Sequence, residues 1–326
     1  MTDGVAITRK GERWHRSGHP WSYQDDVELV DPQLSGQVVR VQSFDGRRLG
    51  QALFNAASKI RLRWLTDDPE RVIDRSFWAD RLDRAIHLRQ RVVQETTAFR
   101  LISSESDGFP GLIVDQYGPV LVLQSLSLGI EKQLPILLEL LVERIRPEAV
   151  VARNDSQVRA LEGMSLEKKV LYGKLPDRIE VQEGERRYRV DVLEGQKTGA
   201  YLDQRENRLN ARRYARGRAL DVFAYQGGFT LQVSAHCQEV LAIEDSEWAA
   251  SRIRENLSLN GVSNVQVERD NAFNRLRRLD EEGQKFDLVI LDPPPSPRAR
   301  RRSPERFGDT RRSTAGPCGS FSPAER

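Results

Sequence analysis

The stretch that decides the fold is FDLVILDPP, residues 286–294. Its apolar run from Leu288 to Leu291 predicts a buried, central strand of a parallel sheet. Asp292 and the two prolines after it would then lie at the carboxyl end of that strand, where open α/β sheets bind their ligands. The stretch therefore predicts an enzyme site with Asp292 in it.

The sequence before this stretch alternates strand-like and helix-like segments. Strands are expected at 219–223, 239–244 and 265–269, and helices at 230–237 and about 247–260. Strands that alternate with helices along the chain predict a doubly wound parallel sheet. The fold class of this part is therefore α/β, of the Rossmann-like type.

Two features at the strand ends indicate a nucleoside-containing cofactor. The pair Gly227-Gly228 allows a ligand to approach the backbone, and Glu244 ends the next strand, where a carboxylate can accept two ribose hydroxyls. The pair is not a GxGxxG loop for a pyrophosphate, so S-adenosylmethionine, which has no phosphate, is the expected cofactor. Taken singly, each feature also fits a plain turn or a helix cap.

Two further units precede the parallel sheet. Residues 1–68 predict a small β barrel, because short strands alternate with turn signals, and residues 69–172 predict a central α/β domain. Residues 173–294 hold a hairpin and the parallel sheet, and residues 295–326 form a separate tail. The segments behind this division are strands at 38–44, 49–54 and 59–65, a strand meander within 99–126, a helix at 130–145, a strand at 149–153 and a hairpin at 178–192.

The composition excludes several classes of protein. A chain of 326 residues, 38% hydrophobic and 30% charged, can form two or three folded domains. Two cysteines and four histidines argue against a disulfide framework or a zinc site, so we expect no metal and a reducing, cytoplasmic setting. The sequence shows neither a signal-peptide core nor an apolar stretch of the ~18 residues that span a membrane. Secretion and membrane insertion are therefore not expected.

The charge is unevenly distributed. Residues 295–326 hold eight arginines against three acidic residues, a net charge of +5, so residues 1–294 carry −2 of the total of +3. Local basic clusters nevertheless lie beside aromatic residues, as in Arg9-Lys10 and Arg13-Trp14. Such clusters bind RNA through phosphate contact and base stacking, although solvated protein faces carry them as well.

Five segments together resemble the methyltransferase half of the RlmI (YccW) family of large-subunit rRNA cytosine-C5 methyltransferases. They are QKTGAYLDQRENR (196–208), LDVFAYQGGF (220–229), IEDSEWAASRIRENLSLNG (243–261), RDNAF (269–273) and FDLVILDPP. GHPW at 18–21 and SESDGFPGLIVDQYG at 104–118 resemble the PUA domain and the central domain of the same family. The resemblance implies a class I enzyme that transfers a methyl group from S-adenosylmethionine to carbon 5 of a cytosine in 23S rRNA.

The resemblance also implies roles for individual residues. Contacts to the amino-acid part of the cofactor fall to Lys197, Thr198, Tyr201, Gln204 and Arg205. The wall and loop under the methionine fall to Asp221, Phe223, Tyr225, Gly227 and Gly228. Glu244 and Asp245 would hold the ribose, and either Asp270 or Asn271 the adenine edge, whereas Asp292 would lie near the methyl donor and the target base. RNA contacts on the N-terminal unit fall to Arg9, Lys10, Arg13, His19 and Trp21.

Methylation at cytosine C5 needs a cysteine thiolate that first adds to C6. In the family this cysteine lies beyond the DPP motif, and nothing here matches that segment. Cys237 is expected in the helix after the glycine pair as a buried apolar residue, and Cys318 lies in the tail without the flanking pattern. We therefore expect weak or absent methyl transfer.

The tail has too few aliphatic residues to form the remaining strands of the sheet. We hypothesise a frameshift after Pro294, because Gly308–Thr314 can be encoded so that another frame gives Gly-Tyr-Lys-Glu-Ile-Asn, which resembles the family's downstream segment. The sheet would then be incomplete, with an exposed edge strand. A disordered RNA-binding tail is the alternative.

Two other functions stay open at this point. One is methyl transfer to an exocyclic base amine, and the other is RNA binding without catalysis. The oligomeric state is open too, with a dimer among the alternatives.

Overall fold

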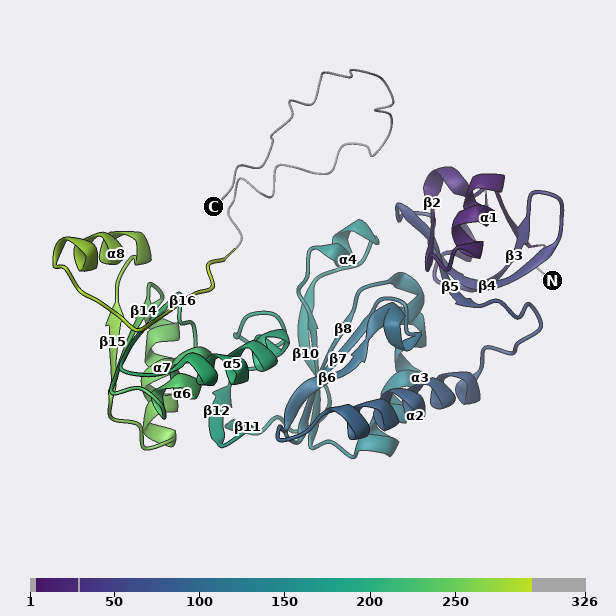
Figure 1. Cartoon of the computed structure of the whole chain (residues 1–326). Helices are drawn as coiled ribbons and strands as arrows, with labels where there is room; N and C mark the ends of the chain where they lie inside the picture. The colour runs from purple at the N-terminus through teal and green to yellow at the C-terminus, as the bar shows by residue number, and fades with distance from the viewer. Residues whose placement is uncertain (1–3, 29, 295–326) are drawn as a thin grey trace, which may run out of the picture.

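Three units follow one another along the chain (Figure 1). The computed structural model describes residues 4–294 except residue 29. The tail lies outside the described residues. It contains Cys318 and the stretch to which the frameshift hypothesis applies. We refer below to the barrel unit (residues 4–66), the central unit (75–173) and the parallel-sheet unit (179–291).

The barrel unit is a curved five-stranded sheet in the order β1-β3-β4-β5-β2. Ile7, Val41 and Leu62 are fully buried in its core. The three predicted strands are confirmed as β3, β4 and β5, whereas the helix α1 was not predicted. The elements are β1 (Val5–Ile7), α1 (Arg9–Arg16), β2 (Trp21–Tyr23), β3 (Val38–Ser43), β4 (Arg48–Phe54) and β5 (Ile60–Thr66).

The central unit is a five-stranded sheet in the order β10-β9-β8-β7-β6, with α2 and α3 on one face. Trp78 of α2 and Leu140 of α3 pack there against Leu121 and Val150 of the sheet. The predicted meander, helix and following strand are confirmed, but the edge strand β10 was not predicted. The elements are α2 (Arg75–Val92), β6 (Ala98–Ser103), β7 (Leu112–Tyr117), β8 (Val120–Ser125), α3 (Leu128–Ile145), β9 (Ala149–Asn154), α4 (Val158–Leu161) and β10 (Glu167–Gly173).

The parallel-sheet unit has four parallel strands in the order β15-β14-β13-β16, with helices on both faces. Leu231 of α6 and Ile253 of α7 pack against one face, and Leu279 of α8 against the other. The predicted doubly wound class is therefore confirmed. The elements are β11 (Ile179–Glu183), β12 (Arg186–Val190), α5 (Arg205–Ala211), β13 (Arg218–Val222), α6 (Gly228–Ser234), β14 (Glu239–Glu244), α7 (Glu247–Leu259), β15 (Val265–Arg269), α8 (Ala272–Glu281) and β16 (Leu288–Leu291).

Two predictions concern β16: a buried, central strand, and an exposed edge strand if the sheet is incomplete. Among the described strands it is the outermost on its side of the sheet, because its one strand partner is β13. Val289 is 48% exposed and Leu291 is 57% exposed. Among the described strands, an apolar sequence of the kind found in central strands thus lies at the edge of the sheet.

The second face of the central sheet joins the parallel-sheet unit. Tyr117 and Val122 of this face share one hydrophobic core with Val181 and Val190 of the hairpin and with Ile253 of α7. The hairpin β11–β12 therefore lies between the two sheets, and the two units meet through a packed interface.

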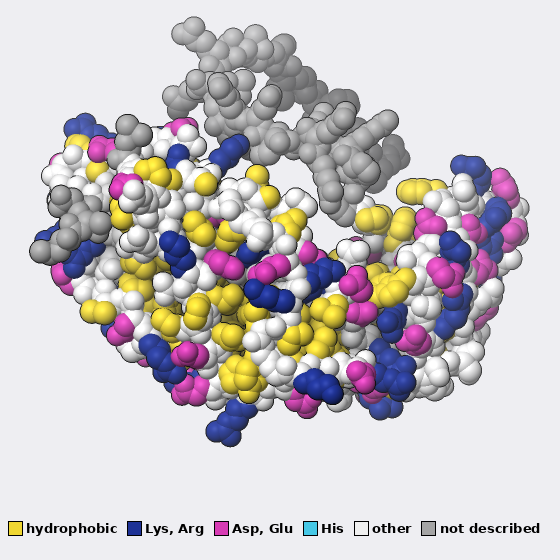
Figure 2. Space-filling model, turned by 180° about the vertical axis from the view of Figure 1, so that it is seen from behind, with side chains coloured by type: hydrophobic (Ala, Val, Ile, Leu, Met, Phe, Trp, Pro, Cys, Tyr) yellow, Lys and Arg dark blue, Asp and Glu magenta, His cyan; other side chains and the backbone are white. Residues whose placement is uncertain are grey.

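Charges of both signs are mixed on the surface. Figure 2 shows Lys and Arg side chains interspersed with Asp and Glu on the face it presents, which agrees with the small net charge of residues 1–294. No helix among residues 4–28 and 30–294 is long and apolar enough to span a membrane.

Candidate active site

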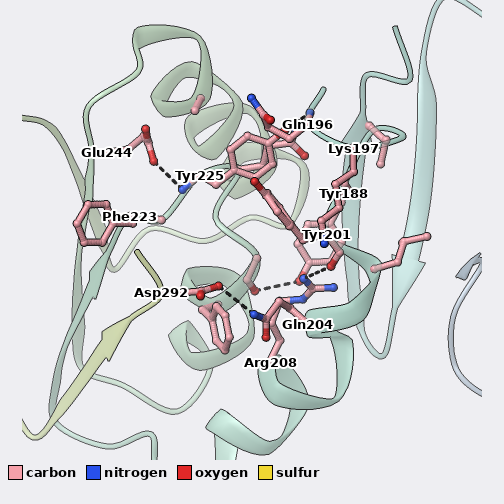
Figure 3. Close-up of a pocket in the computed structure, with 18 of the residues that line it drawn as sticks. Tyr188, Gln196, Lys197, Tyr201, Gln204, Arg208, Phe223, Tyr225, Glu244 and Asp292 are labelled. Carbon is pink, nitrogen blue, oxygen red and sulfur yellow. Dashed lines mark hydrogen bonds between the residues drawn. The ribbon is translucent and has the colours of Figure 1, made fainter. Parts of the chain in front are cut away.

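A cavity of about 730 Å³ opens at the carboxyl ends of β13, β14 and β16 (Figure 3). Ligand sites for cofactor-sized molecules have volumes of roughly 300–1,000 Å³. The loop between β12 and α5 closes the cavity on the side opposite the strand ends. The predicted residues that line it are Lys197, Tyr201, Gln204, Phe223, Tyr225, Gly228, Glu244, Asp245 and Asp292.

The turn after β13 has a strained backbone. Phe223 and Tyr225 have φ values of 65° and 51°, and Gly227 has 80°, so three residues of one turn occupy the left-handed region. Backbone strain of this kind is found where a surrounding structure holds a functional site in place. At this turn it directs the side chains of Phe223 and Tyr225 into the cavity lining.

Asp221, near the end of β13, connects this turn to the first residues of α6. Its Oδ2 accepts hydrogen bonds from the backbone N–H of Thr230 at 3.0 Å and from the Thr230 hydroxyl at 2.5 Å. The carboxyl group is buried, and burial raises its pKa to about 7, with the nearby charges of Asp292 and Glu244 acting in the same direction. Asp221 was predicted as a cofactor contact, but it fixes the first turn of α6 and is not among the residues that line the cavity.

Glu244 ends β14 with both carboxylate oxygens oriented by the backbone. Oε2 accepts from the N–H of Tyr225 at 2.8 Å, and Oε1 accepts from the N–H of Ser246 at 2.9 Å. Each oxygen keeps a lone pair for a further donor. The helix α7 has its own cap, Ser246, so Glu244 is available to accept hydrogen bonds from a pair of hydroxyls.

Aromatic rings form one wall of the cavity. The ring of Tyr225 lies edge-on to that of Tyr201, with 5.2 Å between centroids, and 6.1 Å from that of Trp248. Trp248 was not predicted, although an aromatic residue at the start of the helix that follows the strand-end acid could have indicated it. Rings so placed can pack against the flat face of a purine.

Gln204 connects the predicted cofactor segment with the DPP turn. Its Nε2 donates to Asp292 Oδ2 at 3.1 Å, and its Oε1 accepts from Asn207 Nδ2 at 2.6 Å. Figure 3 shows Gln204 and Asp292 facing each other at the mouth of the cavity. Lys197 lies in the same loop as Gln204, where its Nζ pairs with Asp203 at 2.8 Å and lies 4.6 Å from the centre of the Tyr201 ring.

Several predicted residues lie outside the cavity lining, for identifiable reasons. Thr198 is buried and donates to Asp115, and Arg205 donates to the carbonyl of Gln94. Asp270 pairs with Arg278, and Asn271 caps the N-terminus of α8. Gly227 caps α6 with its backbone. The sequence could not separate these structural roles from ligand contacts, because both use the same residue types.

The position predicted for Cys237 is wrong. The residue lies in the turn between α6 and β14, beyond the end of the helix at Ser234. It is buried against Ala219, Val233 and Val240, and burial raises the pKa of its thiol. Cys237 is not among the lining residues of the cavity. In residues 4–28 and 30–294, no cluster of three or more His, Cys, Asp or Glu side chains is arranged to hold a metal ion.

The predicted RNA contacts of the barrel unit lie on or next to α1. Arg13 and Trp14 are exposed, and the guanidinium of Arg9 lies 4.3 Å from the centre of the Phe44 ring. Lys10 pairs with Asp26 at 3.2 Å. Two other candidates are engaged within the protein: Trp21 Nε1 donates to Glu105 at 2.8 Å, and His19 Nδ1 lies 3.0 Å from the carbonyl of Trp21.

Two solved structures share this architecture. A putative methyltransferase, SMU.776, complexed with SAH has a TM-score of 0.77 and 17% sequence identity, over 89% of this chain and 76% of that chain. A putative SAM-dependent methyltransferase from Streptococcus mutans has a TM-score of 0.75 and 18% identity, over 89% and 77% of the two chains. The class I methyltransferase fold is therefore confirmed.

The sequence of the chain matches two domain families and a family of curated relatives. Residues 5–67 match the model of a PUA-like domain, and residues 204–299 match the model described as Conserved hypothetical protein 95. Ribosomal RNA large subunit methyltransferase I from Erwinia tasmaniensis and from Escherichia coli are each 37% identical to the chain over 303 residues, which is 90% of this chain and 76% of theirs.

The chain belongs to the ribosomal RNA large subunit methyltransferase I family. Membership in this family confirms the resemblance drawn from the five motif segments. It also agrees with the order of units along the chain, in which a PUA-like unit precedes the methyltransferase fold.

Proposed function

We propose that this chain binds S-adenosylmethionine in the cavity and presents it to a cytosine of 23S rRNA, with carbon 5 as the methyl acceptor. The observation that carries the proposal is the convergence of Glu244, the aromatic wall and Asp292 on one cavity at the strand ends. The family of the chain supports the rRNA substrate.

The chemistry of the lining fits this cofactor. Glu244 offers two oriented carboxylate oxygens for the ribose hydroxyls, and Trp248 with Tyr225 offers a flat apolar surface for the adenine. Lys197 can meet the carboxylate of the methionine part. When bound, the cofactor supplies an electrophilic methyl group.

The residues of the chain would act on the target base by orienting it. Asp292 is held by Gln204 at the cavity mouth, where its carboxylate can accept a hydrogen bond from the exocyclic amine of a cytosine. Pro293 and Pro294 line the cavity beside it and restrict the backbone of the turn. The base would thereby be held against the methyl donor.

Activation of carbon 5 needs a thiolate that adds to C6, makes C5 nucleophilic and leaves again after C5 has lost its proton. Cys237 is buried outside the cavity lining, and Cys318 lies outside the described residues. We therefore propose that the cavity binds the cofactor and that Cys237 is not this thiolate. Sequencing of the gene beyond the codon for Pro294 tests the frameshift hypothesis.

Isothermal titration with S-adenosylmethionine, followed by a labelled-methyl assay on unmodified 23S rRNA, tests the proposal. We expect saturable cofactor binding and incorporation of label at carbon 5 of a cytosine. Normal turnover to 5-methylcytosine would show that a thiol is in place, and label on an exocyclic amine would identify the other reaction class. Binding of rRNA without cofactor affinity would overturn the proposal in favour of a non-catalytic RNA-binding protein.

A further inference from the structure

We propose that the central unit positions the cofactor site through one loop, residues 191–201, with Arg153, Asp115 and Tyr117 as the positioning residues. This inference rests on the proposed binding of S-adenosylmethionine in the cavity. It assigns a role in cofactor binding to a unit that lies outside the methyltransferase fold. We call residues 191–201 the anchored loop.

One side of the anchored loop faces the cavity. Gln196, Lys197 and Tyr201 belong to its lining. The backbone N–H of Gln196 donates to the hydroxyl of Tyr225 at 2.7 Å, which ties the loop to the turn after β13. The position of the loop therefore sets the position of one cavity wall.

Arg153 anchors the first half of the loop from β9 of the central sheet. Its Nη1 donates to the carbonyl of Val192 at 2.8 Å, and both Nη atoms lie 3.1 Å from the carbonyl oxygen of Gly195. Asp155 fixes the plane of the guanidinium through Nε and Nη2, at 3.3 and 3.1 Å. Arg153 is 4% exposed, so these bonds form away from solvent, where they are strong.

Asp115 and Tyr117 anchor the second half from β7. The hydroxyl of Thr198 donates to Asp115 Oδ2 at 2.7 Å, so the Tyr117 hydroxyl, 2.9 Å away, donates to Thr198. The Tyr117 oxygen also accepts from the N–H of Ala200 at 3.1 Å. Asp115 in turn accepts two bonds from Arg100, at 2.9 and 3.1 Å. Thr198 and Asp115 are each 1% exposed.

The anchored loop has a conformation that its own sequence does not favour. Lys197 has a φ of 54° without being a glycine, and Gly199 has a φ of 144°. A Cβ at Gly195 would lie 2.4 Å from the carbonyl oxygens of both Asp191 and Gly199. Strained backbone persists only where surrounding contacts hold it. The contacts that hold this loop come largely from the central sheet.

The test compares cofactor affinity with fold stability in the full chain. Arg153→Lys removes the fork that holds two carbonyls, and Thr198→Val removes the hydroxyl while keeping the shape. Loss of a buried hydrogen bond to a charged group predicts a Kd for S-adenosylmethionine about tenfold weaker in each variant. Isothermal titration measures the Kd, and thermal unfolding measures stability.

Two matched controls separate positioning from general destabilisation. Thr198→Ser keeps the hydroxyl and should bind like the unaltered chain. Arg89→Lys alters a comparable partly buried ion pair of the central unit, with Asp107, that makes no contact with the loop. We expect its Kd to stay within about twofold of the unaltered chain, whatever its melting temperature. Equal Kd values for Arg153→Lys and Arg89→Lys would overturn the inference.

Hydrogen exchange of the amides of residues 191–201 gives a second measurement that needs no cofactor. Arg153→Lys and Thr198→Val should speed exchange in the loop, whereas Arg89→Lys should not. If the unaltered chain binds no S-adenosylmethionine, the proposed function fails, and hydrogen exchange alone decides on the anchoring. Unchanged loop exchange in both variants would refute the anchoring itself.

Discussion

Glu244 is a carboxylate whose two oxygens are already engaged by backbone N–H groups before any ligand arrives. The substitution Glu244→Gln keeps the shape but turns an NH₂ group toward one of these N–H groups. We expect the Kd for S-adenosylmethionine to weaken by about 10- to 100-fold, since a charged hydrogen-bond acceptor is lost. Isothermal titration measures it.

The control for this prediction lies at the other end of the same strand. Glu239 begins β14 and pairs with Arg218 on the surface. Glu239→Gln should leave the Kd unchanged. Equal losses of affinity in the two variants would contradict a specific role of Glu244.

Asp221 predicts a pH dependence of stability. Its pKa in the folded chain is raised to about 7 by burial, so the folded state retains a proton that the unfolded state has already released. The stabilising contribution of that proton is present below the ordinary aspartate pKa of about 4 and is lost as the pH rises through about 7. Asp221→Asn carries no such proton.

Melting temperatures of the unaltered chain and of Asp221→Asn, measured from pH 5 to pH 8, test this prediction. The melting temperature of Asp221→Asn should rise relative to that of the unaltered chain as the pH increases, because only the unaltered chain loses the stabilising contribution of the Asp221 proton. A constant difference between the two chains over this range would show that Asp221 does not titrate there.

The sequence predicted the cavity position of residues that end or directly follow a strand. It did not predict which polar residues bond to distant parts of the chain. Glu244 and Asp292 were predicted at the carboxyl end of the sheet because each follows an apolar, strand-like run, and both line the cavity there. Thr198 was predicted as a ligand contact, but Asp115, 83 positions earlier in the chain, accepts its hydrogen bond. A contact between residues so far apart leaves no local pattern in the sequence.

At the scale of elements, the two outer strands of the parallel sheet differ in chemistry. β15 carries Gln266, Glu268 and Arg269, whereas β16 is entirely apolar. Charged residues on an edge strand prevent pairing with other chains, and an apolar edge invites it. Among the described strands, β16 is therefore the expected site of self-association.

Val289→Lys tests this expectation. Val289 is 48% exposed, so a lysine can reach solvent, and the free energy of unfolding should change by less than about 0.5 kcal/mol. Light scattering of concentrated protein should fall relative to the unaltered chain. Gln266→Lys on the opposite, already polar edge should leave scattering unchanged. Similar scattering from all three chains would show that β16 does not mediate association.

Elements that depend on local pattern were predicted, whereas α1 and β10 were not. α1 is eight residues long and includes Gly11, whose Cβ would lie 2.9 Å from the carbonyl oxygen of Asp26. So short a helix is stable only through its Thr8 cap and its packing. β10 is exposed over most of its length and is held by backbone pairing with β9. Backbone pairing leaves no periodic pattern of apolar side chains, so the sequence did not indicate this strand.

At the scale of the whole molecule, a buried polar cluster joins the barrel unit to the central unit. Arg63 of β5 pairs with Glu162 at 3.0 Å and with Glu105 at 3.1 Å. Glu162, which is 3% exposed, also accepts from Asn55 at 3.0 Å and from Ser58 at 2.5 Å. The two units are therefore coupled through charged groups in the fold.

Glu162→Ala should uncouple the two units. It leaves Arg63 buried with one countercharge fewer, which predicts a loss of roughly 3 kcal/mol or more in the free energy of unfolding. Calorimetry should show a lower or divided transition. Glu143→Ala, which removes an exposed partner of Arg75, should leave the transition in place. Identical transitions for the two variants would contradict the coupling.

The linear order of the three units sets a minimum length for an RNA that contacts both the barrel unit and the cavity. The barrel unit lies at one end of the molecule and the parallel-sheet unit at the other, with the central unit between them (Figure 1). An RNA that contacts both must be long enough, or folded in such a way, to reach past the central sheet. A short oligonucleotide that carries only the target base would forgo every contact with the barrel unit.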